Sequence, residues 1–244
     1  MSAVDLNARA SKDFEAKLAE TKALLRRAAS EFTPVTQASS LGAEDVVITH
    51  LINSLALDIP VFVLETGMLH KETLDLLERT KANSRAPVDV YQPSHEAVVQ
   101  FVKREGKEPM YKSVELRKAC CHIRKVEPLE RALAGKRAWI TGLRREQSNA
   151  RAEVPLIDTS DQAQTGRAKL NPLANWTWGD VWHYIQLHKV DYNPLHDQFY
   201  PSIGCQPCTR AISLGEDFRA GRWWWEDEAA KECGLHVKEE RSPA

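Results

Sequence analysis

Five cysteines are the residues of this chain whose type and spacing suggest chemistry most directly. Four of them form two pairs, the adjacent Cys120 and Cys121 and the later Cys205 and Cys208, which are separated by Gln-Pro. Four thiolates from two distant pairs are the ligand set that an iron–sulfur cluster or a structural zinc ion requires. The spacing alone favours neither metal, and four unrelated buried thiols are a third interpretation.

The fifth cysteine, Cys233, lies in the polar C-terminal run Glu-Cys-Gly-Leu-His. A single thiol apart from both pairs is typical of a nucleophile, which nearby cations activate by lowering the pKa of the thiol. His236 follows three residues later and would share a helical face with Cys233. The alternative for His236 is an exposed histidine in a polar tail.

Several cations are candidates to bind an anionic substrate, because arginine matches the paired oxygens of phosphate or sulfate. On a helix, Lys125 would share a face with Cys121, four residues earlier. Each cation taken alone could equally be a solvated surface charge, so only the set indicates an anion site. The candidates are Lys125, Arg144, Arg145, Arg151, Arg219 and Arg222.

Composition limits the classes of protein to consider. The 244 residues carry 33 basic and 34 acidic side chains, so net charge does not indicate nucleic-acid or membrane binding. The N-terminus is polar, and no run of about 18 apolar residues is present. We therefore expect a cytoplasmic protein, in which cysteines bind metals or react rather than form disulfides.

Alternating strand and helix patterns predict the framework that must position these residues: a doubly wound, mostly parallel α/β sheet. We expect strands at 35–38, 59–64, 88–91 and 136–141, and helices at 6–29, 46–57, 69–81, 94–103 and 179–188. Cys120 and Cys121 should open a helix that runs to Leu133, and residues 149–168 should form a loop. In such sheets ligands bind beyond the carboxyl ends of the strands.

The turn Ser39-Ser40-Leu41-Gly42-Ala43-Glu44-Asp45 follows the first expected strand and precedes an apolar helix. Backbone N–H groups at a helix start bind anions in this arrangement, although an ordinary helix cap by serine or aspartate gives the same pattern. Leu64 ends the second strand and Gly142 follows the fourth. Both should therefore lie at the same edge of the sheet.

Taken together, the two cysteine pairs, the SSLGAED, LETG and GLRREQS turns and the terminal ECGLH resemble the assimilatory adenylyl-sulfate reductases. These belong to the family of adenylyl-sulfate and phosphoadenylyl-sulfate reductases. The likeness runs from about residue 35 to 236, and the joint order of the motifs makes it specific. It implies an adenine nucleotide α-hydrolase-like (PP-loop) fold. We expect an N-terminal helix over 1–30, a nucleotide- and cluster-binding domain over 31–215 and a mobile catalytic tail over 216–244.

The resemblance also implies an activity. Adenosine 5′-phosphosulfate is reduced to sulfite and AMP through an S-sulfocysteine, with thioredoxin or glutaredoxin as the electron donor, in sulfate assimilation and cysteine biosynthesis. One 4Fe-4S cluster per subunit is implied on Cys120, Cys121, Cys205 and Cys208. Members that reduce the 3′-phosphorylated substrate usually lack these cysteines, so the substrate without that phosphate is favoured. A homo-oligomer is also expected.

The residue roles carried over from the family fall into three groups. Catalysis is assigned to Cys233, Lys125 and His236. The phosphosulfate is expected to face Lys125, Arg151, Arg219 and Arg222, and Arg144 is expected to contact substrate too. The adenosine edge is expected at Ser39, Ser40, Gly42, Glu44, Asp45, Leu64 and Gly142. Many cluster-bearing members have the order S-x-S-G, whereas this chain has Leu41 at the second serine's position, so Ser40 is the hydroxyl available to replace it.

Three other functions remain to be separated. A reductase of the 3′-phosphorylated nucleotide would have the same fold. An ATP pyrophosphatase would use the serine–glycine turn but gives no role to ECGLH. An iron–sulfur sensor would be a non-enzyme, and no basic helix pair for DNA is evident.

Overall fold

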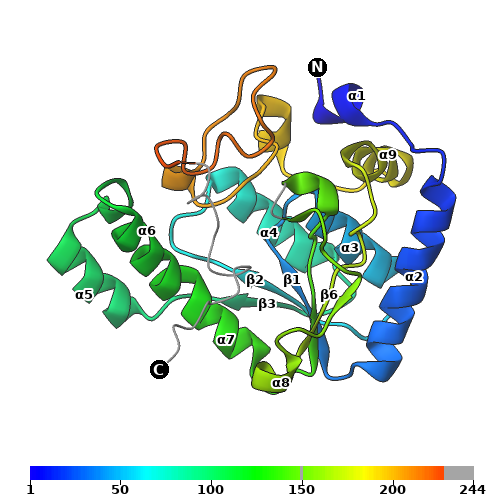
Figure 1. Ribbon diagram of the computed structural model, residues 1–244, viewed down its shortest axis with the longest axis horizontal. Helices are drawn as coiled ribbons and strands as arrows, with labels where there is room; N and C mark the ends of the chain where they lie inside the picture. Colours follow the sequence, from blue (N-terminus) through cyan, green and yellow to red (C-terminus); the bar gives the residue numbers. More distant parts are fainter. Residues whose placement is uncertain (149–150, 228–244) are drawn as a thin grey trace.

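A six-stranded sheet in the order β3-β2-β1-β4-β6-β5 forms the centre of the protein (Figure 1). The computed structural model describes residues 1–148 and 151–227. All neighbouring strands pair in parallel except β5 and β6, which are antiparallel. The strands are β1 (Val35–Ser39), β2 (Val61–Leu64), β3 (Val88–Tyr91), β4 (Ala138–Ile140), β5 (Ile157–Asp158) and β6 (Ala168–Leu170). The predicted mostly parallel sheet is confirmed.

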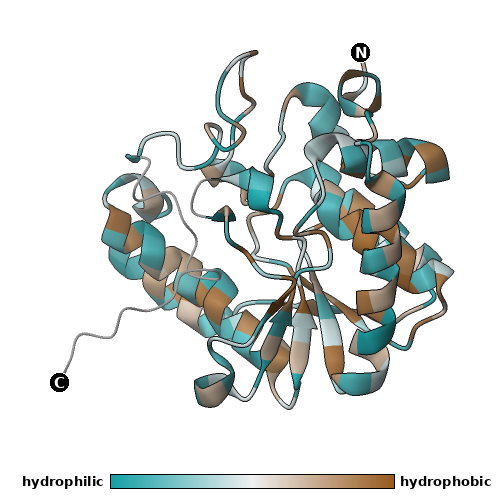
Figure 2. Cartoon of the chain, turned by 45° about the vertical axis from the view of Figure 1, so that its right-hand side comes forward, coloured by the Kyte–Doolittle hydropathy of each residue, from teal (hydrophilic) through white to brown (hydrophobic). Residues whose placement is uncertain are grey.

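Helices cover both faces of this sheet, which confirms the doubly wound class. Successive side chains on a strand point to opposite faces, so on β2 Val63 joins the main core whereas Phe62 joins a second one. The main core packs helices α2 (Phe14–Glu31), α3 (Ala43–Ser54), α4 (Lys71–Asn83) and α9 (Trp178–His188) against the sheet. The second core packs α7 (Glu127–Leu133) on Phe62 and Trp139. Figure 2 shows apolar residues concentrated in the strands and on one side of several helices.

The remaining helical elements are shorter or lie outside the sheet layers. They are α1 (Ala3–Asn7), α5 (His95–Glu105), α6 (Val114–Cys121), α8 (Gln162–Thr165), the π-helix η2 (His122–Val126), and the 3₁₀ turns η1 (Pro109–Tyr111), η3 (Arg145–Gln147), η5 (Pro194–Gln198) and η6 (Gln206–Cys208). Among the residues described, no helix combines the length and apolar character needed to cross a bilayer.

The order of the strands creates a switch point between β1 and β4. The chain adds β2 and β3 on one side of β1 and then returns to place β4 on its other side. Loops that leave neighbouring strands in opposite directions open a crevice at the carboxyl edge of the sheet. The turn after Ser39 and the loop after Ile140 both leave from this point.

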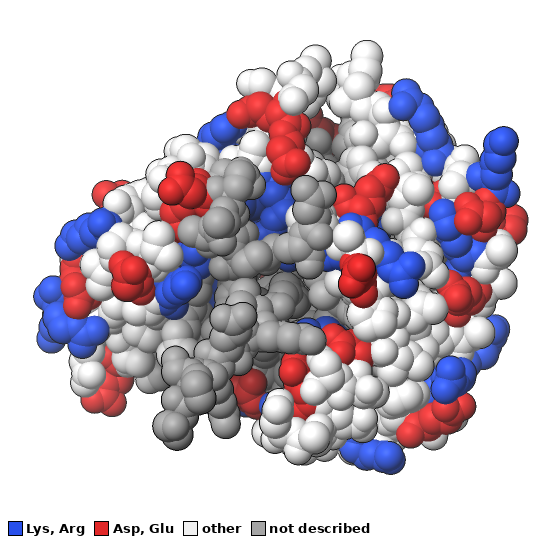
Figure 3. All heavy atoms as spheres, viewed as in Figure 1, with Lys and Arg blue, Asp and Glu red and all other residues white. Residues whose placement is uncertain are grey.

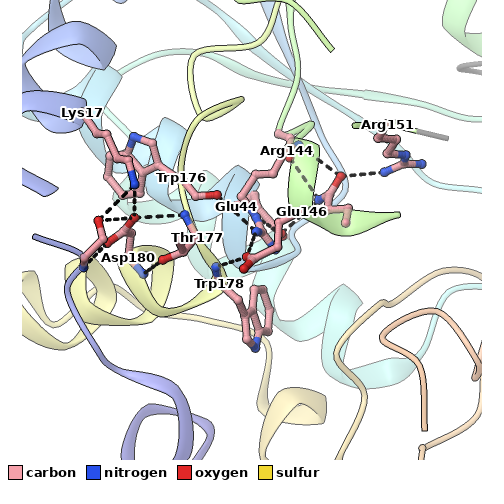
Figure 4. Close-up of polar contacts among 12 residues, drawn as sticks. Lys17, Glu44, Arg144, Glu146, Arg151, Trp176, Thr177, Trp178 and Asp180 are labelled. Atoms are coloured by element: carbon pink, nitrogen blue, oxygen red, sulfur yellow. Dashed lines mark hydrogen bonds and ion pairs between the residues drawn. The ribbon is translucent and has the colours of Figure 1, made fainter. Parts of the chain in front are cut away.

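The N-terminal helix predicted over 6–29 is wrong in its first part, because the chain forms α1 and α2 with a break between them. Asp180 at the start of α9 occupies that break, accepting hydrogen bonds from the backbone and side chain of Ser11 at 2.7 and 2.9 Å. It also pairs with Lys17 at 3.2 Å (Figure 4). The predicted cap by Thr177 is confirmed, since its hydroxyl accepts a hydrogen bond from Asp180 N at 3.0 Å.

Cys120 and Cys121 end a helix, where the sequence predicted that they would open one. Helix α6 begins after Ser113, whose hydroxyl accepts a hydrogen bond from Leu116 N at 3.2 Å. The chain then passes through η2 into α7, near the start of which lies Pro128. Proline has no N–H to donate one turn back and clashes there in a regular helix. The wider π turn directly before Pro128 accommodates it, so helical structure continues from 114 to 133.

Residues 149–168, predicted as a loop, contain β5 and α8 and reach the first residue of β6. The two strands have two and three residues, too few for an alternating pattern to be visible. Leu170 is fully buried beside Ile140 in the parallel pairing of β6 with β4. The secondary structure of this segment is therefore determined by its pairing with the rest of the sheet, because its local sequence is polar.

Candidate active site

A pocket opens at the switch point between β1 and β4 and is lined from two sides. The sheet side contributes Ser39, Ser40, Gly42, Glu44, Asp45, Leu64 and Gly142, and the other side contributes Lys125, Arg151, Arg219 and Arg222. The structure therefore gathers residues that are up to 183 positions apart in the sequence (39 to 222). On the face shown in Figure 3, Lys and Arg side chains are visible near the middle, and both signs of charge are intermixed around the rim.

The turn after β1 is held by its own serines and by Asp45. The Asp45 carboxylate accepts hydrogen bonds from the backbone N and the hydroxyl of Ser40, at 2.6 and 2.7 Å. Leu41 has a φ of +60° and is buried, so it shapes the turn and packs into the core. Helix α3 starts at Ala43, Gly42 before it provides no side-chain cap, and the first turn of the helix lies at the pocket.

Asp45 is a buried carboxyl group at the floor of this turn. Burial raises its pKa to about 6, although the hydrogen bonds from Ser40 act in the opposite direction. Gly142 makes room for it, because a Cβ at position 142 would lie 2.4 Å from Asp45 Oδ1. The glycine is thus required by a close approach between the loop after β4 and the first turn of α3.

Arg144 does not line the pocket, which departs from the predicted substrate contact. Its Nε donates to Glu44 Oε1 at 2.9 Å and its Nη1 donates to Glu146 Oε2 at 2.8 Å (Figure 4). The guanidinium, 1% exposed on its side chain, also lies 5.3 Å from the Trp178 ring. Arg144 therefore fixes the Glu44 carboxylate from behind the pocket.

Gln147 connects this buried network to the pocket surface. Its amide nitrogen donates to Glu44 Oε1 at 3.0 Å, and its amide oxygen accepts from Arg151 Nη1 at 2.7 Å. The sequence places Gln147 in the GLRREQS turn but does not indicate a role for it. The signal that could have found it was its position on the same turn as Gly142.

The opposite wall comes from the segment after α9. Arg222 Nη1 lies 3.3 Å from both Ser202 Oγ and Ile203 O. Its guanidinium covers Gly204, where an added Cβ would lie only 2.4 Å from Nη2. An isolated antiparallel bridge pairs Arg222 with Thr209, just after Cys208. The arginines of this wall are therefore positioned by the same segment that carries the second cysteine pair.

The four paired cysteines come together beside this wall. Cys120, Cys205 and Cys208 are buried in one cluster with Phe101, Met110 and Trp223, and the half-buried Cys121 packs against it. Within the described residues, these four cysteines form no disulfide bond. The Thr66 hydroxyl lies 3.3 Å from Cys205 Sγ. The structure thus joins cysteines from α6 and from η6 that are more than eighty residues apart in the sequence.

These thiols fit an iron–sulfur cluster in number, protection and charge. Burial raises the pKa of Cys208 to about 12, with Cys205 adding to the effect and Lys125 and Arg222 opposing it. Burial also raises the pKa of Cys120, while Arg124 opposes that shift. Cations therefore surround a group of thiols that becomes strongly anionic once it binds metal as thiolates.

In the described part of the chain, no three His, Cys, Asp or Glu side chains are arranged to hold one metal ion. Four thiolates are the ligand set of either a structural zinc ion or an iron–sulfur cluster.

Lys125 lies in η2 and lines the pocket, within electrostatic range of Cys120 and Cys208. The prediction that Lys125 lies between the cysteines and the substrate stays a prediction. Cys233 and His236 lie outside the described residues, as does most of the tail predicted over 216–244.

This chain is similar in sequence to known sulfonucleotide reductases. The phosphoadenosine phosphosulfate reductase domain matches residues 34–211. The adenosine 5′-phosphosulfate reductase of Allochromatium vinosum is 51% identical over 88% of this chain and 84% of its own length. The enzyme of the same name from Burkholderia cepacia is 51% identical over 92% of this chain and 89% of its own.

Solved structures agree on the fold. A phosphoadenylyl-sulfate reductase from Candida auris, in a phosphate complex, has a TM-score of 0.66 at 27% identity and covers 82% of this chain and 98% of that one. A Candida glabrata FMN adenylyltransferase has a TM-score of 0.56 at 13% identity over 98% of this chain and 84% of its own, a likeness of fold alone. Together with the sheet order, the pocket and the cysteine group, these matches show that the chain belongs to the phosphoadenosine phosphosulfate reductase domain family.

Proposed function

We propose that this chain reduces adenosine 5′-phosphosulfate to sulfite and AMP in the cytoplasm, as a step of sulfate assimilation that feeds cysteine biosynthesis. The observation that carries the proposal is the pocket itself. It has a sheet edge suited to a nucleotide on one side and Lys125, Arg151, Arg219 and Arg222 on the other, beside four gathered cysteines. Relatives with half of their residues identical to this chain are named adenosine 5′-phosphosulfate reductases, which supports this choice of substrate.

The nucleotide is oriented by the two ends of the pocket. Backbone groups at Leu64 and Gly142 frame the adenine and ribose, and the first turn of α3 at Gly42 faces the phosphate, where a helix start favours anions. The arginines and Lys125 neutralise the phosphosulfate. Because AMP is a good leaving group, positioning and charge neutralisation are the main demands on the protein.

The reaction proceeds in two displacements at sulfur. The thiolate of Cys233 attacks the sulfuryl sulfur, the bond from sulfur to the bridging oxygen breaks, and AMP leaves with that oxygen. A thiolate of reduced thioredoxin or glutaredoxin then attacks Cys233 Sγ, and sulfite leaves with the electron pair of the S–S bond. The second thiol of the carrier resolves the mixed disulfide and restores Cys233, so the carrier supplies both electrons. His236 is proposed to assist the thiolate.

Cys120, Cys121, Cys205 and Cys208 would hold a 4Fe-4S cluster. Bound there, the cluster would supply a compact negative charge beside Lys125 and join the helix α6 to the segment after α9. We propose an electrostatic and structural role for this site, because the dithiol carrier already provides the two electrons. Anaerobic purification followed by iron and sulfide analysis tests occupancy, and loss of both from Cys205→Ala is the expected result.

The decisive experiment is to incubate the protein with adenosine 5′-phosphosulfate labelled in the sulfuryl group, without a carrier, and to map the label by mass spectrometry. Label on Cys233 that is absent from Cys233→Ser is the expected result, and label on another cysteine would overturn the mechanism. Steady-state rates with adenosine 5′-phosphosulfate and with its 3′-phosphorylated form show which of the two nucleotides is the substrate. Size-exclusion chromatography tests the expected homo-oligomer.

A further inference from the structure

A buried ion pair ties the cysteine-bearing helix α6 to the end of the described C-terminal segment. Arg117 Nε donates to Glu226 Oε1 at 3.0 Å, and Arg117 Nη2 donates to Glu226 Oε2 at 2.7 Å. The side chain of Arg117 is 0% exposed and that of Glu226 is 3% exposed. Because the guanidinium of arginine is charged at any ordinary pH, Arg117 remains the cation of this pair.

The same arginine connects to the cysteine group and to the pocket. Arg117 lies one helical turn before Cys121, which is also among its hydrogen-bond partners. Its guanidinium carbon lies 4.7 Å from the centroid of the Trp223 ring, and that of Arg222 lies 4.6 Å from the same centroid. Trp223 is 1% exposed, and its backbone N donates to Cys208 O at 3.3 Å. Two guanidinium groups thus share one buried indole, with Arg222 in the pocket.

A pair of this kind is not explained by stability alone. Burying two charges costs solvation free energy that their attraction often fails to recover, and well-packed apolar side chains commonly replace such pairs without loss. What the pair provides is a fixed geometry, because an arginine fork and a carboxylate meet in one orientation. The geometry fixed here is that of Trp223, and through it of Arg222.

We propose that Arg117 and Glu226 are positioning residues for the sulfur-transfer step. They set the place of Arg222 in the pocket and the point from which the segment with Cys233 continues. This inference rests on the proposed function, since it takes Cys233 as the nucleophile. Glu226 stands seven positions before Cys233. Seven residues span at most about 25 Å when fully extended, so fixing Glu226 limits how far from it the Cys233 thiol can lie.

The chain offers a matched control in a second arginine–glutamate pair of the same segment. Arg210 Nη1 and Nη2 donate to the Glu216 carboxylate at 3.0 and 2.7 Å, so the contacts are the same in kind. This pair is 37% and 32% exposed on its two side chains, and neither residue lines the pocket. Glu226→Gln and Glu216→Gln therefore remove the same charge from the same segment at a buried and at an exposed site.

The test measures single-turnover formation of the Cys233 adduct at saturating substrate, with hydrogen exchange of the peptide covering 218–226 and the visible spectrum of the holoenzyme. We expect Glu226→Gln to slow the adduct about ten- to a hundredfold, the range expected for a small misplacement of reacting groups. The affinity for AMP should fall by a smaller factor than the rate of adduct formation. Hydrogen exchange should rise in residues 218–226, and the visible spectrum should not change. Glu216→Gln should match the wild type in every measurement.

Equal rates for the two variants would overturn the inference. A merely structural pair would raise exchange along α6 as well and would bleach the visible spectrum, which also counts against positioning. If Glu226→Gln does not fold, Arg117→Lys keeps the charge, loses the fork, and is read in the same way. An absent Cys233 adduct in the wild type would overturn the proposed function, whereas a normal adduct with a fast Glu226→Gln variant would overturn this inference alone.

Discussion

Two buried arginine–glutamate pairs flank the pocket, and they differ in what holds them. Arg144 and Glu44, 2.9 Å apart, join the loop after β4 to the first turn of α3. Arg117 and Glu226, 2.7 Å apart, join α6 to the end of the described chain, where Glu226 itself lies in no helix or strand. The first pair links elements that the parallel sheet already places side by side. The second links elements that no backbone pairing brings together at that point.

The fold itself positions the side of the pocket near Arg144 and Glu44, the sheet side. Side-chain contacts position the side near Arg117 and Glu226, the cysteine side. Around Arg144, the neighbours Glu146, Gln147 and Trp178 restrain the same groups. Around Glu226, the restraint is the Arg117 fork and the Trp223 ring. Substitutions on the sheet side should therefore reduce stability first, and those on the cysteine side should reduce turnover first.

The largest expected effect is on the sheet side. Arg144→Met leaves the Glu44 carboxylate buried without its cation, which should lower the free energy of unfolding by about 3 to 5 kcal/mol. Urea unfolding measures this change. Arg145→Met, on the exposed neighbouring arginine, is the control and should stay within about 0.5 kcal/mol of the wild type. If Arg144→Met lowered the free energy of unfolding as little as Arg145→Met does, the two sides of the pocket would not differ in the way described.

The next effect concerns pH and Asp45, also on the sheet side. Its pKa in the folded protein is about 6, above the ordinary value of 3.8. Between these values the native state holds a proton that the unfolded chain has lost, so this carboxyl makes the protein less stable as pH rises through that window. At about 1.36 kcal/mol for each pKa unit, the change amounts to roughly 3 kcal/mol.

The measurement compares the wild type with Asp45→Asn by urea unfolding at several pH values from about 4 to 7. The stability of the wild type relative to the variant should fall over that range. His196, whose pKa burial lowers to about 4, has the opposite pH dependence, but it is present in both proteins and cancels. If the difference in stability between the wild type and Asp45→Asn did not change with pH, the pKa of Asp45 would not be raised in the folded protein.

A smaller effect, on activity and not on stability, is expected from Gly204→Ala on the cysteine side of the pocket. The new methyl group would push the Arg222 guanidinium away, and a flexible side-chain end can yield without unfolding the protein. We expect kcat/KM to fall about tenfold, by misplacement of a binding cation, with Tm unchanged. Gly215→Ala provides a contrast with open space, although its positive φ of 91° adds backbone strain. Full activity in Gly204→Ala would place Arg222 outside the reaction.

The smallest expected change in stability is the most discriminating. Arg117→Met combined with Glu226→Leu replaces the buried pair by apolar side chains, which is often neutral for stability. The double variant should unfold at nearly the wild-type urea concentration and yet form the Cys233 adduct as slowly as Glu226→Gln. A stable variant with wild-type turnover would show that the cysteine-side pair is structural only.

The sequence predicted the parts of the site that depend on strand ends. The apolar runs of β2 and β4 are visible locally, and β1 directly precedes the serine–glycine turn. Parallel strands place their following turns at one edge, so Ser39, Leu64 and Gly142 could be grouped in advance. The buried position of Arg144 could not be predicted, because it depends on a contact with Glu44, one hundred positions away. No local pattern links Arg117 with Glu226, since their contact spans 109 positions.

The glycine at 204 has a consequence for how this site can change over evolution. Its φ is not in the left-handed region, so its lack of a side chain matters only because the Arg222 guanidinium occupies the space where a Cβ would lie. A larger residue at 204 and an arginine in this place at 222 therefore exclude each other. Among natural sequences with this fold, the two positions should be substituted together: where 204 is not glycine, 222 should have lost its arginine or the loop should have changed length.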